Sequence, residues 1–247
     1  MGASCGKIDD GCGTEIDCSG CGLGYECAGN SCLVFLSDGL VSFYDFEIDA
    51  SDVQGNNPGT FVGDAASIED VARGKVLGLD GAGDYVDITE NFDLSEGELS
   101  MSIWFYLDDQ DRMAAAPYQS YEQYALIGQG NSYWGRSFYF YLRTQIANEM
   151  SFGANRYSRS GNVDVGVWTH VVGIIDGDNF KLYQNNYLVT DWTKSIPSLT
   201  PINDLMIGYM PSLSDPKYFE GKMDNVRIYN KALTAVEVAD LYDNENV

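Results

Sequence analysis

The chain has 247 residues, of which 37 are Asp or Glu and 14 are Lys or Arg, giving a formal net charge of −23. Such a charge repels phosphate backbones and anionic lipid headgroups, so nucleic acid and membrane surfaces are excluded as expected partners. The sequence also lacks an apolar run of the roughly 20 residues that a membrane-spanning helix needs, so no membrane insertion is expected. The length suffices for one large all-β domain with a small appendage.

The first part of the chain is rich in cysteine and glycine. So short a segment lacks the apolar residues to bury a core, and disulfides would supply the missing constraint on its unfolded state. We predict that residues 1–36 form a disulfide knot, serving as a spacer or cap rather than as a small carbohydrate-binding unit, and that the protein is extracellular, either secreted or on the cell surface. A zinc site or a redox site would have to use the single Cys-x-x-Cys pair. The segment has no second such pair and no nearby histidine, so neither role is favoured. The six cysteines are Cys5, Cys12, Cys18, Cys21, Cys27 and Cys32, and their pairing cannot be deduced from spacing.

Residues 37–247 carry the pattern of an all-β domain. Apolar and polar residues alternate in short segments separated by turn residues, as strands buried on one face require. Strands are expected at residues 40–47, 76–79, 85–88, 99–107, 124–127, 137–142, 150–152, 168–175, 180–184, 205–208 and 221–229. Only residues 234–242 have helical spacing, and there Thr234 as N-cap and Glu237 form a capping box. The pattern predicts a two-sheet antiparallel sandwich followed by a short C-terminal helix.

Several motifs follow one another in a defined order. A strand, a Gly-rich turn and a second strand occupy residues 74–88 (GKVLGLDGAGDYVDI), and residues 99–105 (LSMSIWF) form the next strand. Residues 168–177 (WTHVVGIIDG), 180–183 (FKLY) and 221–233 (GKMDNVRIYNKAL) complete the set. The ordered set resembles the laminin-G-like branch of the concanavalin A-like lectin/glucanase jelly rolls. The resemblance implies a two-sheet jelly-roll sandwich that binds a partner, most often a glycan.

Two features could suggest catalysis. Glu47, Asp49 and Asp52 approximate a strand motif of glucanases with this fold, in which two carboxylates act as nucleophile and acid/base. Here the acids lie where the opening strand ends and a turn begins, so catalysis is not expected there. His170 is the only histidine and is expected to be a satisfied structural residue. No catalytic residue is predicted, although a hydrolase with an unfamiliar carboxylate pair remains an alternative.

The resemblance also implies a structural calcium ion (Ca2+) between the turn after the opening strand and the last long strand. Calcium prefers oxygen ligands from carboxylates, amides and backbone carbonyls. Matched onto this chain, the family positions are Glu47, where Asp is more usual, Asn56, Asn57 and Gly59 in the turn, and Asp224 in the last strand. The alternative is structural: the two asparagines shape the turn, and Asp224 pairs with Arg227.

A group of aromatic and polar residues in loop-like segments is the predicted ligand site. Sugars present apolar ring faces and hydroxyls, so a sugar-binding surface needs flat aromatic rings beside planar polar groups. The candidates are Tyr118, Tyr121, Tyr133, Trp134, Asn155, Arg156, Tyr157 and Arg159. The alternative is that some of these rings fill the core or cover a sheet edge.

The core itself is expected to contain Trp104 and Trp168, with Phe46, Leu79, Ile103, Val172 and Ile228 at alternating apolar positions. Together these features predict a non-catalytic extracellular carbohydrate-binding or adhesion module whose partner is a glycan or glycoprotein, with other domains of a longer secreted chain as further partners. A protein-binding module of a secreted or surface assembly and a glycan-cleaving hydrolase are the alternatives.

Overall fold

The structure is a computed structural model. It describes residues 7–9, 15–17, 25–28, 31–34, 36–88, 97–108, 123–129, 138–143, 149–154, 157–193, 195, 205–210 and 217–246. In the strands before residue 35, and in β13 and β14, the description covers the backbone alone. Within the part of the chain so described, no helix has both the length and the apolar character needed to cross a lipid bilayer.

Two small hairpins lie in the cysteine-rich segment. β1 (Lys7–Asp9) pairs with β2 (Glu15–Asp17), and β3 (Tyr25–Ala28) pairs with β4 (Ser31–Val34). The register of the second hairpin places Cys27 opposite Cys32. The other four cysteines lie outside the described residues, so the disulfide knot stays a prediction.

The first large sheet has eight strands. Its order is β17-β16-β15-β10-β21-β8-β7, and β5 also pairs with β21. The strands are β5 (Leu40–Tyr44), β7 (Ala66–Asp70), β8 (Gly74–Asp80), β10 (Glu98–Leu107), β15 (Trp168–Asp176), β16 (Asn179–Gln184), β17 (Tyr187–Thr193) and β21 (Glu220–Tyr229).

The second large sheet has seven strands in the order β14-β13-β12-β11-β18-β9-β6. They are β6 (Gly59–Val62), β9 (Tyr85–Ile88), β11 (Gln123–Gln129), β12 (Phe138–Arg143), β13 (Glu149–Ala154), β14 (Tyr157–Asn162) and β18 (Leu205–Ile207). A separate two-stranded unit, β19 (Tyr209–Met210) with β20 (Lys217–Tyr218), follows β18. All pairings in the two sheets are antiparallel, which confirms the predicted all-β sandwich.

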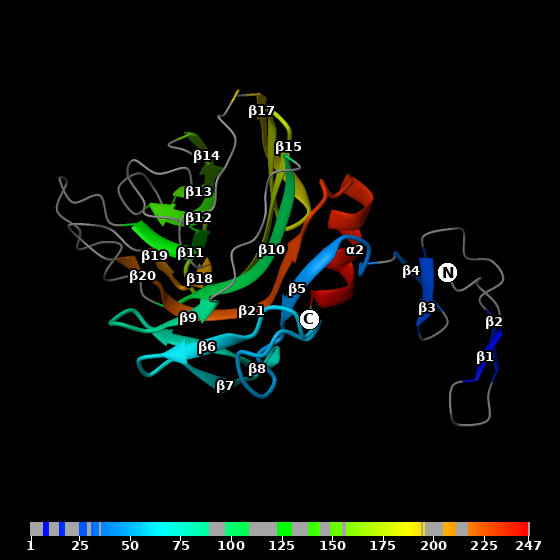
Figure 1. Ribbon diagram of the computed structural model, residues 1–247, viewed down its shortest axis with the longest axis horizontal. Coiled ribbons are helices and arrows are strands. Elements are labelled where there is room, and N and C mark those ends of the chain that lie inside the picture. Colours follow the sequence, from blue (N-terminus) through cyan, green and yellow to red (C-terminus); the bar gives the residue numbers. More distant parts are fainter. Residues whose placement is uncertain are drawn as a thin grey trace.

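Strand β10 shows how the core is built. Successive side chains of a strand point to opposite faces. One set points to the other sheet and joins the main hydrophobic cluster: Leu99, Met101, Ile103, Phe105 and Leu107. The alternate set, Ser100, Ser102, Trp104 and Tyr106, faces outward, where the C-terminal helix α2 (Ala235–Glu245) covers part of the sheet (Figure 1).

This arrangement corrects one detail of the expected core. Phe46, Leu79, Ile103 and Ile228 are buried between the sheets, as predicted, and Val172 is buried in a second cluster with residues of α2. Trp104 is only 2% exposed, but it lies on the outer face, against residues of α2. Trp168 is on the same face and is only partly buried. The predicted burial is therefore confirmed for Trp104, because both faces of the central strands are covered, and is wrong for Trp168.

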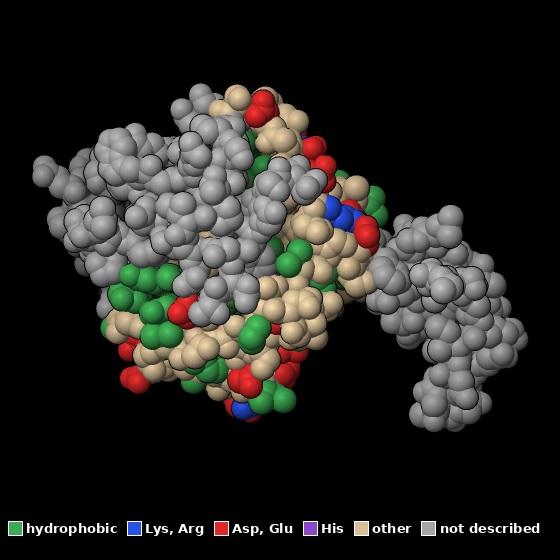
Figure 2. Space-filling view, viewed as in Figure 1, with side chains coloured by type: hydrophobic (Ala, Val, Ile, Leu, Met, Phe, Trp, Pro, Cys, Tyr) green, Lys and Arg blue, Asp and Glu red, His purple; other side chains and the backbone are tan. Residues whose placement is uncertain are grey.

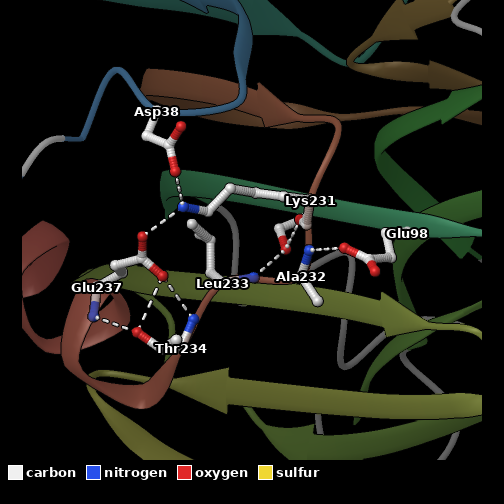
Figure 3. A network of polar contacts seen from close by, with 8 residues as sticks. Asp38, Glu98, Lys231, Ala232, Leu233, Thr234 and Glu237 are labelled. Carbon is white, nitrogen blue, oxygen red and sulfur yellow. Dashed lines mark hydrogen bonds and ion pairs between the residues drawn. The ribbon is translucent and has the colours of Figure 1, made fainter. Parts of the chain in front are cut away.

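Hydrogen bonds fix the start of α2 to the sheet (Figure 3). The predicted capping box is present: the Glu237 backbone N–H donates to Thr234 Oγ1 at 3.3 Å, and the Thr234 N–H donates to Glu237 Oε2 at 2.7 Å. Lys231 Nζ lies 2.6 Å from both Asp38 Oδ2 and Glu237 Oε1. Ser100 Oγ accepts the Leu233 N–H at 2.9 Å. These contacts join the opening segment, β10 and the helix.

Candidate functional site

The predicted ligand residues fall in a part of the chain about which little is described. Tyr118, Tyr121, Tyr133, Trp134, Asn155 and Arg156 lie outside the described residues. Tyr157 and Arg159 lie on β14, the edge strand of the seven-stranded sheet, where only the backbone is described. The predicted ligand site therefore stays a prediction.

Asp52 organises the turn after β5. Its side chain is buried, and Oδ1 accepts the backbone N–H of Phe43 at 2.8 Å and of Gln54 at 3.0 Å. Oδ2 accepts the N–H of Asn56 at 3.1 Å and of Asn57 at 3.0 Å. A carboxylate that accepts four backbone donors holds the chain in one conformation. Asp52 is therefore a structural residue. From the sequence alone it stood out only as the last position of a glucanase-like motif.

The other acids of that motif do not project from a strand either. β5 ends at Tyr44, and Glu47 and Asp49 lie in the bend that follows, both exposed. Asp49 accepts hydrogen bonds from the Ser51 backbone N–H and hydroxyl, which lower the pKa of its carboxyl. The segment is a turn, as the sequence predicts, and the side-chain alternation that a strand motif needs is missing.

The residues matched to a calcium site have protein partners. Asn57 Nδ2 donates to Ser42 Oγ at 2.7 Å, and the Asn57 carbonyl accepts the Tyr44 hydroxyl at 2.6 Å. Asp224 Oδ2 accepts Arg73 Nε at 2.7 Å. The described part of the chain holds no group of three or more His, Cys, Asp or Glu placed to bind a metal ion. Calcium at Glu47, Asn56, Asn57, Gly59 and Asp224 stays a prediction.

His170 is buried in a polar pair beneath α2. It is 1% exposed, its Nε2 lies 2.7 Å from Ser102 Oγ, and its ring stacks on Trp104 with centroids 4.9 Å apart. Its backbone N–H donates to Asn185 Oδ1 at 2.9 Å. Burial, and then the charges of Arg227 and Arg73, lower the pKa of His170 to about 3. A neutral, covered imidazole beside a fully buried serine holds the sheet together, as predicted for a structural histidine.

His170 makes the free energy of unfolding depend on pH. Its pKa falls from 6.5 to about 3 on folding, so the unfolded chain takes up a proton that the folded chain refuses. The stabilising contribution is fully present above pH 6.5 and is lost as the pH falls toward about 3. We expect the free energy of unfolding in urea to be about 2 kcal/mol lower at pH 5 than at pH 7.5. A His170→Gln variant should lose this slope, and an equal slope in both proteins would contradict the assignment.

A cluster of charged and aromatic side chains holds α2 on the outer face, and we call it the helix clamp: Arg73, Trp104, Asp224, Arg227 and Glu245. Arg73 pairs with Asp224, its Cζ lies 4.3 Å from the Trp104 ring centroid, and its Nη1 donates to the Glu245 carbonyl at 2.7 Å. Glu245 Oε2 accepts Trp104 Nε1 at 2.8 Å, and Oε1 pairs with Arg227. Asp224 thus pairs with Arg73 and not with Arg227, the partner considered from the sequence.

A β-bulge brings Asp224 and Arg227 of β21 to the same face. Opposite β10, Ser102 pairs with Arg227 and Trp104 pairs with Asp224, so β21 has one extra residue. Asn225 takes it up with a φ of 47°, which asparagine tolerates better than most residues. Burial raises the pKa of Asp224, and the Arg73 guanidinium opposes that rise. The helix clamp is a buried structural network, and it leaves a ligand no access to the Ser102–His170 pair.

Three tyrosines from separate strands form a group of partly exposed aromatic rings, which we call the tyrosine cluster. Tyr85 on β9 lies 4.8 Å from Tyr209 on β19, measured between ring centroids. Tyr209 stacks on Tyr218 of β20 at 4.6 Å and 18°, and Tyr85 lies 6.4 Å from Tyr218. All three are partly exposed. Figure 2 shows hydrophobic side chains gathered where Figure 1 places β9, β19 and β20, with acidic side chains beside them.

Local backbone features position these rings. Gly208 has a φ of 83°, and a Cβ there would lie 2.5 Å from Leu79 Cδ1. Its N–H donates to the Leu126 carbonyl, and its own carbonyl accepts the Phe219 N–H, both at 2.8 Å. Glycine therefore permits the backbone to turn from β18 into β19 close to β8.

The start of β9 is fixed separately. Asp84 is buried and its carboxylate accepts the N–H of Asp64 at 2.6 Å and of Asp80 at 3.1 Å, which closes the Gly-rich turn. Val86 and Ile88 then point inward, and Tyr85 points outward. The cluster could not be predicted from the sequence, because its members come from three separate strands. The available signal was the outward position of Tyr85 in the predicted strand.

The hydroxyls of Tyr85 and Tyr209 remain protonated over the ordinary pH range. Burial, and then Asp87 and Tyr218, raise the pKa of Tyr85. Burial, and then Tyr218 and Tyr85, raise the pKa of Tyr209. The cluster therefore offers aromatic faces and neutral hydroxyls that can donate or accept hydrogen bonds.

Comparison with solved structures identifies proteins of the same fold. Domain 4 of AbnA, a GH43 extracellular arabinanase from Geobacillus stearothermophilus solved with arabinotriose, is 22% identical, with a TM-score of 0.63 over 82% of this chain and 98% of that domain. The ligand-binding domain of botulinum neurotoxin serotype D, solved with N-acetylneuraminic acid, is 14% identical, with a TM-score of 0.62 over 84% of this chain and 51% of that one. A mutant Trypanosoma rangeli sialidase displaying trans-sialidase activity is 16% identical, with a TM-score of 0.61 over 83% of this chain and 32% of that one.

At these identities the likeness shows a shared fold. That fold occurs both in a domain solved with a bound sugar and in a sialidase chain, so it does not separate binding from catalysis. No curated protein matches the sequence. The laminin G type 3 family model, described as the concanavalin A-like lectin/glucanases superfamily, matches residues 80–239, more than half of the chain. The chain therefore belongs to the concanavalin A-like lectin/glucanases superfamily.

Proposed function

We propose that this protein is a non-catalytic, extracellular carbohydrate-binding module. One observation supports the non-catalytic part: three of the described groups that could serve hydrolytic chemistry hold the fold instead. Asp52 accepts four backbone N–H groups, Asp224 pairs with buried Arg73, and His170 is neutral beneath α2. A general acid or base must instead reach a substrate proton.

Binding of a glycan or glycoprotein is supported by the family and by structures of the same fold solved with arabinotriose and with N-acetylneuraminic acid. The surface predicted from the sequence, around Trp134, Tyr157 and Arg159, supplies aromatic and planar polar groups of the kind that sugar sites use. The extracellular location follows from the predicted disulfide knot.

A protein-binding module is the second candidate, because β17 ends the eight-stranded sheet with exposed apolar side chains. Tyr187 is 79% exposed, Leu188 50% and Val189 37%. Sheet edges with such side chains can pair with a strand of another protein. The glycan proposal is preferred because the family and the sugar-bound structures both bear on it.

A glycan array, followed by incubation of each bound sugar with the protein, tests the proposal. We expect saturable binding to at least one glycan and no release of shorter products, because binding without catalysis leaves the sugar intact. Variants Trp134→Ala and Tyr157→Ala should each weaken binding by roughly tenfold if the predicted surface is the site. Cleaved products would contradict the non-catalytic assignment, and an array without any bound glycan would favour the protein-binding candidate.

The same protein sample can be used to test whether calcium is bound. Elemental analysis and a thermal melt with and without EDTA measure whether calcium is bound and whether it stabilises the fold. A Tm lowered by EDTA and restored by calcium would support the ion. An unchanged Tm with no calcium in the sample would exclude it.

A further inference from the structure

The tyrosine cluster has the composition of a sugar-contacting surface, and none of its members is among the ligand residues predicted from the sequence. Tyr209 contacts both other rings, and each of the three keeps part of its surface exposed. Neither of the two hydrophobic clusters formed by the described residues includes them. Their position is therefore not explained by packing of the core, and aromatic rings at a surface offer flat apolar faces to a partner.

The charge around the cluster discriminates between classes of sugar. Asp87 follows Tyr85 by two positions on β9, and Glu220 follows Tyr218 by two positions, with buried Phe219 between them. Alternation along extended chain places each acid on the same side as its tyrosine. Asp87 is close enough to contribute to the raised pKa of Tyr85. These acids, in a protein with a net charge of −23, disfavour an anionic sugar at this surface.

We propose that Tyr85, Tyr209 and Tyr218 form a binding site for a neutral oligosaccharide. A sugar ring contacts the exposed aromatic faces, and the tyrosine hydroxyls exchange hydrogen bonds with the sugar hydroxyls. The Gly208 turn and the Asp84 turn hold the three strands in place, so the rings are arranged before the ligand arrives. This site rests on the proposed carbohydrate-binding function and specifies the ligand class.

Titration calorimetry with single-site variants tests the site. The probes are arabinotriose, xylotriose and cellotriose as neutral sugars, and N-acetylneuraminic acid as the anionic sugar. For the neutral sugar that binds best, Tyr209→Ala and Tyr218→Ala should each weaken binding by roughly tenfold, and Tyr209→Phe, which keeps the ring, by about threefold or less. The control is Tyr187→Ala, which removes a tyrosine that is 79% exposed on β17, and it should bind as the wild type does.

A second measurement avoids variants that fail to fold. Side-chain NMR of the wild-type protein with labelled tyrosine follows the three rings directly, and a saturating neutral sugar should shift their resonances while leaving that of Tyr187 unchanged. If the wild type binds a neutral sugar but the cluster resonances stay fixed, or if folded Ala variants bind normally, the site is wrong and the proposed function stands. Tighter binding of N-acetylneuraminic acid overturns the neutral ligand class. If none of the probes binds, the proposed site is wrong. The proposed function is overturned as well only if the glycan array shows no bound glycan.

Discussion

Replacing Trp104 with Ala is expected to lower the free energy of unfolding by about 3–5 kcal/mol. The ring is 2% exposed and packs between Arg73, His170 and Tyr242, at 4.3, 4.9 and 5.6 Å. Its Nε1 donates to Glu245 Oε2. The substitution therefore leaves a cavity beneath α2 and removes one of the groups that hold the helix. Equilibrium unfolding in urea, followed by far-UV circular dichroism, measures the effect.

Trp168→Ala is the matched control, since this tryptophan lies on the same face but is only partly buried. It should lower the free energy of unfolding clearly less than Trp104→Ala does. A Trp104→Phe variant keeps most of the ring and loses the indole N–H, so it should fall between the wild type and the Ala variant. An unchanged denaturation midpoint for Trp104→Ala would show that the outer-face assignment of β10 is wrong.

Removing the charge of Arg73 is expected to cost about 3–5 kcal/mol at pH 7, because it leaves Asp224 buried without its partner. The two side chains are 3% and 7% exposed, and Nε and Oδ2 lie 2.7 Å apart. Without the guanidinium, the already raised pKa of Asp224 rises further. Stability contributed by a group with a raised folded pKa is present at low pH and is lost as the pH rises. The deficit of Arg73→Met should therefore shrink as the pH falls through the raised pKa of Asp224, and should level off below the ordinary Asp value of 3.8.

Two comparisons separate the buried pair from general charge effects. Lys75→Met removes one partner of the exposed pair with Glu69, whose side chains are 40% and 79% exposed, and should change stability by about 0.5 kcal/mol or less. Asp224→Asn added to Arg73→Met removes the orphaned charge and should recover part of the loss. A pH-independent deficit for Arg73→Met, equal to that of the double variant, would contradict the buried-pair account.

Much of the fold follows from sequence because it depends on local patterns. The alternation at residues 99–107 predicts a strand that the structure describes as Glu98–Leu107. Thr234 and Glu237 predict the start of α2, and both capping bonds are present. Edge strands such as β7 and β17 were missed, because none of their side chains is buried and the alternation that marks a half-buried strand is weak.

Long-range pairings could not be predicted in this way. Arg73 and Asp224 are 151 positions apart, and nothing in either local pattern indicates that they meet. The tyrosine cluster has the same origin, since Tyr85 lies in a predicted strand while Tyr209 and Tyr218 belong to short strands without periodicity. Asp52, the last residue of the glucanase-like motif, has a local structural role: its carboxylate accepts four backbone N–H groups.

The place of β21 in the eight-stranded sheet has a consequence for how the chain folds. This strand is the last of the sheet in sequence, yet it is internal: it pairs with β10 along one side and with β5 and β8 along the other. Until it is synthesised, the other strands form three separate groups: β17-β16-β15-β10, β8-β7, and β5 alone. Contacts between such distant segments slow folding, to milliseconds or longer for comparable β-sandwiches. The three groups therefore join only late in synthesis, and their unpaired edges are exposed to aggregation during that interval.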